Sequence, residues 1–296
     1  MLPEDFTNVA HSATTTTIPT TIPYTSTLSD AVSNQISDQI LDKLISSNAI
    51  MICLEDQKTL LDKHSEETIY PASLTKIMTA IVVIENLKLD SEITLPKDIF
   101  PSLYEEDASM AGFSPGETVL AKDLLYGVLL PSGADCCIGL ADYISGSETA
   151  FVDLMNEKAK ELKMTNTHFT NSTGLHDTDH YSTVKDLSLL LEYALQNDTF
   201  YEIFTSKKHS TEPTLLHPGG ITFYNTMFKN MPTSTFPNGS VLGGKTGYTS
   251  EAGLCLASLA TKNNKNYILV TTGADGNHNT EQYNISDALL AYENLE

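Results

Sequence analysis

Residues 73–87 restrict the possible folds of this chain more than any other segment does. From Ile77 to Ile84 almost every position is apolar, so a helix here has no polar face to turn toward water. Such a helix is expected to be central, with other elements packed around it. Pro71 lies just upstream, where a helix commonly begins. The sequence therefore predicts a fold built around one buried helix that starts near residue 73.

The same helix begins with Ser73-Leu74-Thr75-Lys76. A serine and a lysine three residues apart share one helix face, so the lysine amine can take a proton from the serine hydroxyl. Backbone N–H groups and the helix dipole at the first turn favour negative charge developing there. A lysine this deep in an apolar helix is costly to bury without a role. To act as a base it needs a pKa roughly 3 units below the ordinary value, and burial or a second positive charge would lower it.

Two further short motifs follow along the chain, Ser132-Gly133-Ala134 and Lys245-Thr246-Gly247. Lys245 is the expected second positive charge. On a strand, Gly247 would leave room for a substrate along the strand edge, and the Thr246 hydroxyl could bind a carboxylate. Ser132 is expected in a loop at the break between two helices. Each motif alone is commonly an ordinary turn or loop, but the three in this order indicate acyl transfer by a serine on a peptide or a β-lactam.

The order of the predicted elements indicates an α+β fold. The two ends of the chain are expected to build one lobe around an antiparallel five-stranded sheet flanked by helices, with an inserted, mostly helical lobe between them. Four of the strands are expected at 49–54, 241–249, 253–261 and 266–272, with a turn near residues 56–58 leading from the first into its hairpin partner. Helices are expected within 30–48 and at 73–87, 122–130, 136–144, 149–162, 183–196 and 280–294.

The composition changes near residue 30. Residues 1–29 are expected to be a disordered or extended Thr/Pro-rich linker, a type of segment that usually tethers a domain. Residues 30–296 are expected to form one catalytic domain, with an α/β lobe at about 30–90 and 235–296 and a helical lobe at about 91–234. No run reaches the 18 apolar residues of a membrane span, and the start is not signal-like. We expect that a signal or membrane anchor is missing from this sequence.

The charge of the chain excludes several classes of partner. The sequence has 17 basic and 38 acidic residues, a formal net charge of −21. This balance disfavours nucleic acid as a ligand, because binding to phosphates needs a basic patch, and it disfavours docking on anionic lipid. All the basic residues counted are lysines. A bound carboxylate must therefore rely on lysine, hydroxyl and backbone N–H groups instead of a guanidinium.

Other chemistry-bearing residues are expected to be structural. The four cysteines show no C-x-x-C spacing, so buried apolar thiols are expected in place of a zinc site or a disulfide framework. They are Cys53, Cys136, Cys137 and Cys255. His176 and His180 lie near two aspartates but in a loop, and no H-E-x-x-H occurs, which argues against a metal site. The second S-x-x-K, Ser182-Thr183-Val184-Lys185, is expected to be a helix start with a surface lysine.

Three longer stretches carry a resemblance to a known family. They are Tyr70-Pro-Ala-Ser-Leu-Thr-Lys-Ile-Met-Thr-Ala, Leu130-Pro-Ser-Gly-Ala-Asp and Leu242-Gly-Gly-Lys-Thr-Gly-Tyr-Thr. The chain resembles the active-site-serine penicillin-recognising enzymes, whose signatures are S-x-x-K, S-x-N and K-T-G. The first and third are matched in full, and Ser132-Gly133-Ala134 stands at the place of the second. Within these enzymes the chain is similar to the D-alanyl-D-alanine carboxypeptidases, the low-molecular-mass penicillin-binding proteins. The likeness extends from about residue 48 to 290 and implies a β-lactamase/transpeptidase-like fold.

The resemblance implies roles for the motif residues. Ser73 would be the nucleophile, forming an acyl-enzyme with the penultimate D-alanine and releasing the terminal one. Lys76 would activate Ser73, and Ser132 would relay a proton. No metal or organic cofactor is implied. The implied ligands are a peptidoglycan stem peptide ending in D-Ala-D-Ala and β-lactam antibiotics, and the implied location is extracytoplasmic.

The substrate-binding residues follow from the same resemblance. Lys245 and Thr246 would hold the substrate carboxylate, beside Gly247. The backbone N–H groups of Ser73 and Tyr248 would form the oxyanion hole. The family's S-x-N asparagine is Ala134 here, so one amide contact to the substrate is missing at that position.

Two alternatives stay open. A β-lactamase would use the same nucleophile but must position a water for rapid deacylation, and no Glu-x-x-Leu-Asn segment is present for that purpose. A module that binds β-lactams without turnover is compatible with the loss of the motif asparagine. The physiological role, which could be wall trimming, sporulation or glycopeptide resistance, is not indicated by the sequence.

Overall fold

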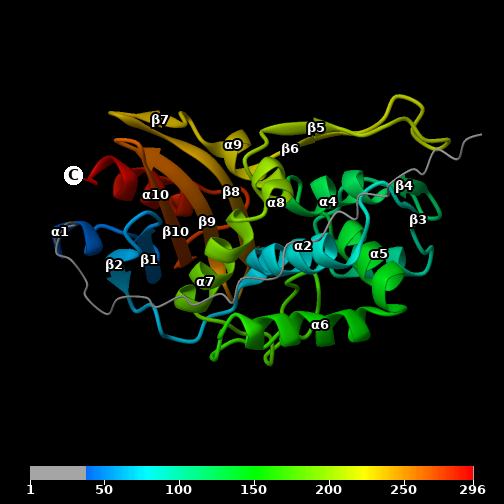
Figure 1. The fold of residues 1–296 in the computed structure, drawn as a ribbon, viewed down its shortest axis with the longest axis horizontal. Coiled ribbons are helices and arrows are strands. Elements are labelled where there is room, and N and C mark those ends of the chain that lie inside the picture. The colour runs from blue at the N-terminus through cyan, green and yellow to red at the C-terminus, as the bar shows by residue number, and fades with distance from the viewer. Residues whose placement is uncertain (1–37, 296) are drawn as a thin grey trace, which may run out of the picture.

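The computed structural model describes residues 38–295, arranged around one antiparallel sheet (Figure 1). The predicted linker at 1–29 and the first part of the predicted helix within 30–48 lie outside the described residues. The α+β fold is confirmed. In spatial order the sheet comprises β2 (Lys58–Lys63), β1 (Asn48–Cys53), β10 (Lys265–Ala274), β9 (Gly253–Lys262), β8 (Gly239–Thr249) and β7 (Thr235–Phe236).

The sheet has six strands, so the predicted number of five was wrong. The five expected strands are all present, and the additional one is β7, which pairs with the first residues of β8. β7 is only two residues long. An alternation of apolar and polar residues cannot be recognised over so short a segment, which is why sequence periodicity did not indicate it.

Among the described residues, six of the predicted helices are present within about three residues of their expected bounds, whereas three short α-helices and one 3₁₀ helix were not predicted. The helices are α1 (Asp38–Leu41), the 3₁₀ helix η1 (Ala72–Leu74), α2 (Thr75–Asn86), α3 (Ile99–Glu105), α4 (Ala121–Leu129), α5 (Ala134–Ser145), α6 (Glu148–Glu161), α7 (Val184–Leu195), α8 (Asp198–Phe204), α9 (Thr226–Asn230) and α10 (Tyr283–Glu293). Two short hairpins accompany them, formed by β3 (Glu92–Thr94) with β4 (Thr118–Leu120) and by β5 (Lys208–Ser210) with β6 (Thr222–Tyr224).

Helix α2 is the buried centre of the fold, as predicted. Every residue from Thr75 to Val83 is buried, and α2 packs against α4, α5, α6, α7 and α8. Figure 1 shows it running through the middle of the helical part of the molecule. Its apolar surface belongs to a large core that also takes in one face of the sheet, where Ile50 and Ile52 of β1 point. Met51, between them, points to a second core under α10 on the opposite face.

The helix expected within residues 30–48 is much shorter among the described residues. Only α1 is helical, and the apolar positions Leu44 and Ile45 lie in the turn that leads into β1. The backbone N–H groups of Ile45 and Ser46 donate to the Asp287 carboxylate of α10, at 3.0 and 2.7 Å. These tertiary hydrogen bonds replace the bonds to preceding carbonyls that a continued helix would need.

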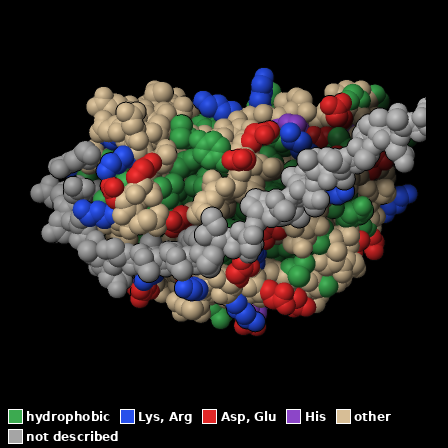
Figure 2. All heavy atoms as spheres, in the orientation of Figure 1, with side chains coloured by type: hydrophobic (Ala, Val, Ile, Leu, Met, Phe, Trp, Pro, Cys, Tyr) green, Lys and Arg blue, Asp and Glu red, His purple; other side chains and the backbone are tan. Residues whose placement is uncertain are grey.

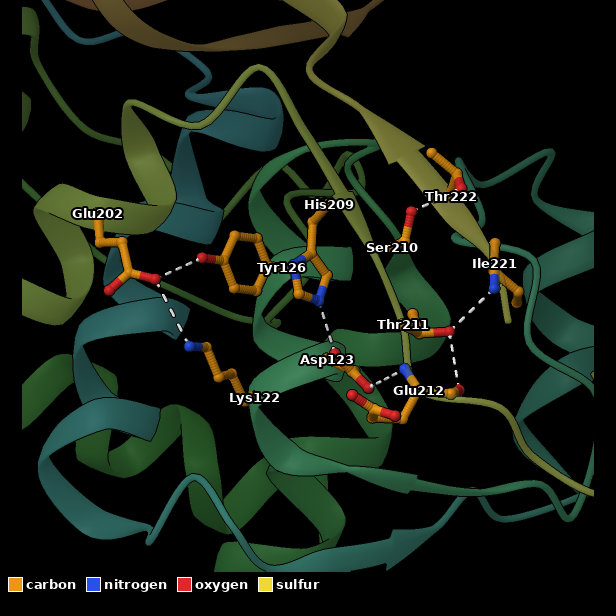
Figure 3. A network of polar contacts seen from close by, with 10 residues as sticks. All are labelled: Lys122, Asp123, Tyr126, Glu202, His209, Ser210, Thr211, Glu212, Ile221 and Thr222. Atoms are coloured by element: carbon orange, nitrogen blue, oxygen red, sulfur yellow. Dashed lines mark hydrogen bonds and ion pairs between the residues drawn. The ribbon is translucent and has the colours of Figure 1, made fainter. Parts of the chain in front are cut away.

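A side-chain network ties the β5–β6 hairpin to α4 (Figure 3). His209 Nε2 lies 2.6 Å from Asp123 Oδ1, and its ring stacks on Tyr126 with centroids 3.7 Å apart. The Tyr126 hydroxyl donates to Glu202 of α8 at 2.8 Å. Because the hairpin begins just after α8 and ends at α9, this network fixes the chain that approaches β8.

Charged side chains are dispersed over the face shown in Figure 2. On the face shown in Figure 2, lysine side chains stand among acidic ones and do not gather into a basic patch. Within residues 38–295 there is no helix with both the length and the apolar character needed to cross a membrane.

Candidate active site

Ser73 is the middle residue of η1, just before α2, on a strained piece of backbone. The preceding residue, Ala72, has a φ of +47°, a conformation that residues other than glycine rarely adopt. Gly174 packs directly against the same peptide, since a Cβ built on it would overlap the Ala72 carbonyl oxygen. Strain of this kind persists only where the surroundings hold it in place, and it is found preferentially at functional sites.

The Lys76 amine contacts the Ser73 hydroxyl, as the S-x-x-K spacing predicts. Lys76 Nζ lies 3.1 Å from Ser73 Oγ and donates to the Thr173 carbonyl oxygen at 2.5 Å. The side chain is 2% exposed, and this burial lowers the pKa of Lys76 below its ordinary value. A buried amine with a lowered pKa, next to a hydroxyl, is suited to remove the hydroxyl proton.

Ser132 and Lys245 form a second serine–lysine pair. Lys245 Nζ donates to Ser132 Oγ at 2.8 Å and to the Thr246 carbonyl oxygen at 2.7 Å. Ser132 lies in the predicted break between α4 and α5, with a φ of +69°. Lys245 is completely buried, and burial, together with the nearby Lys76 amine, holds the pKa of Lys245 well below its ordinary value. The structure thus brings the three sequence motifs together as two hydroxyl–amine pairs.

The two pairs meet at a cleft. A cavity of about 610 Å³ is lined by Ser73, Lys76 and Ala134, and an adjoining one of about 90 Å³ is lined by Ser73 and Ser132. Tyr248 lines both cavities. Ser73 therefore stands where the wider cleft meets the smaller cavity, which places its hydroxyl within reach of a bound chain.

Strand β8 forms one wall of this cleft. A Cβ added at Gly247 would lie 3.1 Å from the Ser73 nitrogen and 3.3 Å from the Ala72 Cβ, so the strand passes very close to the serine. Thr246 lines the smaller cavity, and its hydroxyl lies 2.6 Å from that of Thr226. Among the described strands, β7 pairs only with the start of β8. The backbone of β8 near Gly247 is thus free to bind an extended peptide along its edge.

Ala134 contributes a methyl group where the S-x-N signature has an amide. It is the first residue of α5, it lines the wider cavity, and its N–H donates to the Ser109 carbonyl oxygen at 2.7 Å. Asp135 follows it in the interior, where one carboxylate oxygen accepts from the Ala111 N–H at 2.8 Å. These two contacts hold the loop at 108–111 against the start of α5.

Several residues that line or support the cleft were not found from the sequence. Asn171 Oδ1 accepts from the backbone N–H groups of Thr173 and Gly174, at 3.2 and 2.7 Å, and so holds the carbonyl that receives Lys76. The only local signal for this turn is the polar run Asn171-Ser-Thr-Gly. Thr226 and His278 come to the site from distant segments, and no short motif marks them.

The two loop histidines have separate partners. His180 is buried, its Nε2 lies 2.7 Å from Thr75 Oγ1, and its Nδ1 accepts from the Thr170 N–H at 3.0 Å. His176 instead packs edge-on against Tyr70 and lines the wider cavity. In the part of the chain from residue 38 to 295, no group of three or more His, Cys, Asp or Glu side chains is arranged to hold a metal ion.

The remaining structural expectations for single residues are confirmed. Lys185 of the second S-x-x-K lies on the surface, where its amine pairs with Glu66 at 2.6 Å. The four cysteines are free thiols in the interior. These residues take no part in the cleft.

The chain has relatives among known peptidases. The sequence model of a peptidase family, described as D-alanyl-D-alanine carboxypeptidase, matches residues 34–276. The chain is 37% identical to the D-alanyl-D-alanine carboxypeptidase DacF of Bacillus subtilis over 237 residues, which are 77% of this chain and 57% of DacF. It is 35% identical to the D-alanyl-D-alanine carboxypeptidase of Streptomyces sp. strain K15 over 218 residues, 71% of this chain and 74% of that protein.

The fold has solved relatives as well. The crystal structure of the Streptomyces K15 DD-transpeptidase superposes with a TM-score of 0.75 at 28% identity, covering 85% of this chain and 97% of that one. The chain spans only 57–58% of the length of DacF and of the Escherichia coli relative DacC. The family match extends through most of the described residues and includes the S-x-x-K and K-T-G motifs. This chain belongs to the D-alanyl-D-alanine carboxypeptidase family of serine peptidases.

Proposed function

We propose that this chain is a serine D,D-carboxypeptidase that removes the terminal D-alanine from peptidoglycan peptides ending in D-Ala-D-Ala and is acylated by β-lactams. The observation that carries the proposal is the 3.1 Å contact between Lys76 Nζ and Ser73 Oγ, at the start of a buried helix and at the floor of a cleft. The family's relatives named as D-alanyl-D-alanine carboxypeptidases support the choice of substrate.

The proposed reaction starts with proton transfer from Ser73 to Lys76. The serine oxygen attacks the carbonyl carbon of the penultimate D-alanine, and the N–H groups of Ser73 and Tyr248 stabilise the resulting oxyanion. The peptide C–N bond then breaks, and the leaving amine receives a proton relayed by Ser132. Water hydrolyses the serine ester and regenerates the hydroxyl.

Lys245 has a supporting place in this scheme. Its amine holds the Ser132 hydroxyl, and its buried positive charge, when present, would attract a carboxylate bound at the Thr246 side of the cleft. It would also oppose a charge on Lys76, which keeps Lys76 suited to act as a base. The proposed chemistry uses side chains and backbone N–H groups throughout, without a cofactor.

Two assays test the proposal. Wild-type protein incubated with a D-Ala-D-Ala-ending peptide should release many equivalents of D-alanine, whereas Ser73→Ala should release none, fail to label with penicillin and keep its fold. A single slow equivalent would instead indicate a β-lactam-binding module, and rapid nitrocefin hydrolysis a β-lactamase. Lys245→Ala should reduce kcat/KM far more than Lys88→Ala, a change at an exposed lysine. Equal effects would contradict the role of Lys245.

Transfer to an amine is a second candidate for the final step. The structural likeness to the Streptomyces K15 DD-transpeptidase favours it, because the same acyl-enzyme can be resolved by water or by an amine. Adding a D-amino acid to the peptide assay would divert product into an exchanged peptide if an amine competes with water. We place either reaction outside the cytoplasm, where peptidoglycan stem peptides are found.

A further inference from the structure

The end of the cleft that would receive the substrate carboxylate needs a side chain that binds this group directly. The chain has no arginine, so no guanidinium can bind the carboxylate. Lys245 is fully buried, its Nζ already donates to the Ser132 hydroxyl and the Thr246 carbonyl, and it does not line either cavity. Thr246 offers a hydroxyl in the smaller cavity, but a basic side chain that contacts the carboxylate directly has to be another group that lines the cavity.

The smaller cavity, of about 90 Å³, is electrostatically distinct from the rest of the cleft. Glu106 and Asp107 line the wider cavity, but no acidic side chain from residues 38–295 lines the smaller one, in a chain of net charge −21. Its polar lining consists of hydroxyls and amides, together with one imidazole, that of His278. Among the described residues, His278 is the only basic side chain that lines this cavity.

The loop that follows β10 holds His278 in place. Asn277 at its start accepts from Thr280 N–H and from the Gln282 side-chain amide, at 3.2 and 3.0 Å, so the segment closes into a compact turn. The His278 ring packs edge-on against Tyr248, with centroids 4.8 Å apart and an interplanar angle of 69°. The imidazole is thereby positioned over the strand residue whose N–H is the proposed second oxyanion donor.

We propose that His278 is a substrate-binding residue that donates an imidazole N–H to the terminal carboxylate of the substrate, or to the carboxylate of a β-lactam. The proposal rests on the proposed function, because it identifies the recognition group of the same site. An imidazole keeps at least one N–H donor in both of its protonation states, so the contact needs no fixed charge. The exposed position of His278 on a loop means that it can be replaced without disturbing the core.

The test compares β-lactams with and without the carboxylate. Acylation rates of the full chain are measured with benzylpenicillin and with its methyl ester. We expect His278→Phe, which keeps an aromatic ring against Tyr248, to slow acylation by the free acid about 10-fold or more, the usual effect of losing a hydrogen bond to a charged group. Acylation by the ester should be unchanged. His278→Gln, which restores an N–H donor, should recover part of the rate with the free acid.

A control within the same cleft sharpens the result. His176 lines only the wider cavity, so His176→Phe should affect the free acid and the ester equally. The assignment of His278 to the carboxylate is overturned if His278→Phe slows acylation by the free acid and by the ester equally. It is also overturned if His176→Phe slows acylation by the free acid relative to the ester as strongly as His278→Phe does. Release of D-alanine by the wild type is measured separately. If the wild type releases no D-alanine, the carboxypeptidase proposal is wrong. The acylation rates with the two penicillins would still test whether His278 binds the carboxylate.

Discussion

The close approach of Gly174 to the serine segment yields a sharp prediction about Gly174→Ala. A Cβ at this position would overlap the Ala72 carbonyl oxygen and would lie 2.5 Å from its carbon and 3.0 Å from the Ser73 nitrogen. These are backbone atoms that cannot rotate away. Gly174 also has a φ of +79°, a conformation that alanine adopts at a cost. The substitution should therefore displace the nucleophile or the turn that receives Lys76.

The two costs can be separated with a matched control. Gly146 at the end of α5 has a φ of +75°, but a Cβ there meets no atom within 4 Å. Gly146→Ala should cost only the conformational term, roughly 1–2 kcal/mol. Gly174→Ala should add overpacking of about 1–3 kcal/mol, for a total of about 2–5 kcal/mol. For a chain of this size that corresponds to a fall in Tm of roughly 4–15 °C.

The rate of acylation by fluorescent penicillin, measured well below the Tm of both variants, tests whether the added Cβ displaces the nucleophile. Losing one oxyanion donor typically costs about 10²–10³ in rate, so Gly174→Ala should label at least tenfold more slowly than the wild type. Gly146→Ala should label at the wild-type rate. If Gly174→Ala matches Gly146→Ala in both Tm and labelling rate, the close packing of residue 174 against the serine does not position the nucleophile.

Three further predictions concern buried titratable groups. Burial lowers the pKa of His180 to about 4, and its unfolded value is about 6.5, so the unfolded state binds the extra proton first. The free energy of unfolding should fall by about 2–3 kcal/mol as the pH drops from about 6.5 to 4. Urea denaturation at several pH values measures this fall, and an equally large fall in His180→Gln would contradict the prediction. The pKa of Lys245 is also lowered in the folded state, so the free energy of unfolding should rise as the pH increases toward the pKa of an unfolded lysine. Lys245→Met should make this rise smaller. At pH 7 the same variant should have a higher Tm and a lower activity than the wild type. Burial raises the pKa of Cys136 and Cys137, so iodoacetamide should modify them only after unfolding, and rapid modification of the native protein would show that the region around them opens.

Much of the fold was accessible from local patterns. The apolar run at 77–84 indicated the central helix because a segment without a polar face must be covered on all sides. The three long strands at the C-terminal end were recognised because turns separate them and each is about ten residues long. The short strand β7 was not predicted, and the helix expected within residues 30–48 ends earlier than predicted, at Leu41. β7 is defined only by its pairing with Ser240 and Gly239 of the following strand, and the end of α1 depends on Asp287, which lies 241 residues beyond Ser46.

The chemical groups of the candidate site and their order along the chain can be read from the amino-acid sequence alone. A spacing of three residues in a helical segment is enough to bring Ser73 of η1 and Lys76 of α2 together, because helical geometry is local. The partners of the two lysines depend on the tertiary structure. Thr173 receives Lys76 across 97 residues, and Ser132 receives Lys245 across 113. Only folding could bring His278 against Tyr248. Such contacts leave no periodic trace in the sequence, and the burial that lowers the pKa of both amines exists only once distant segments have closed around them.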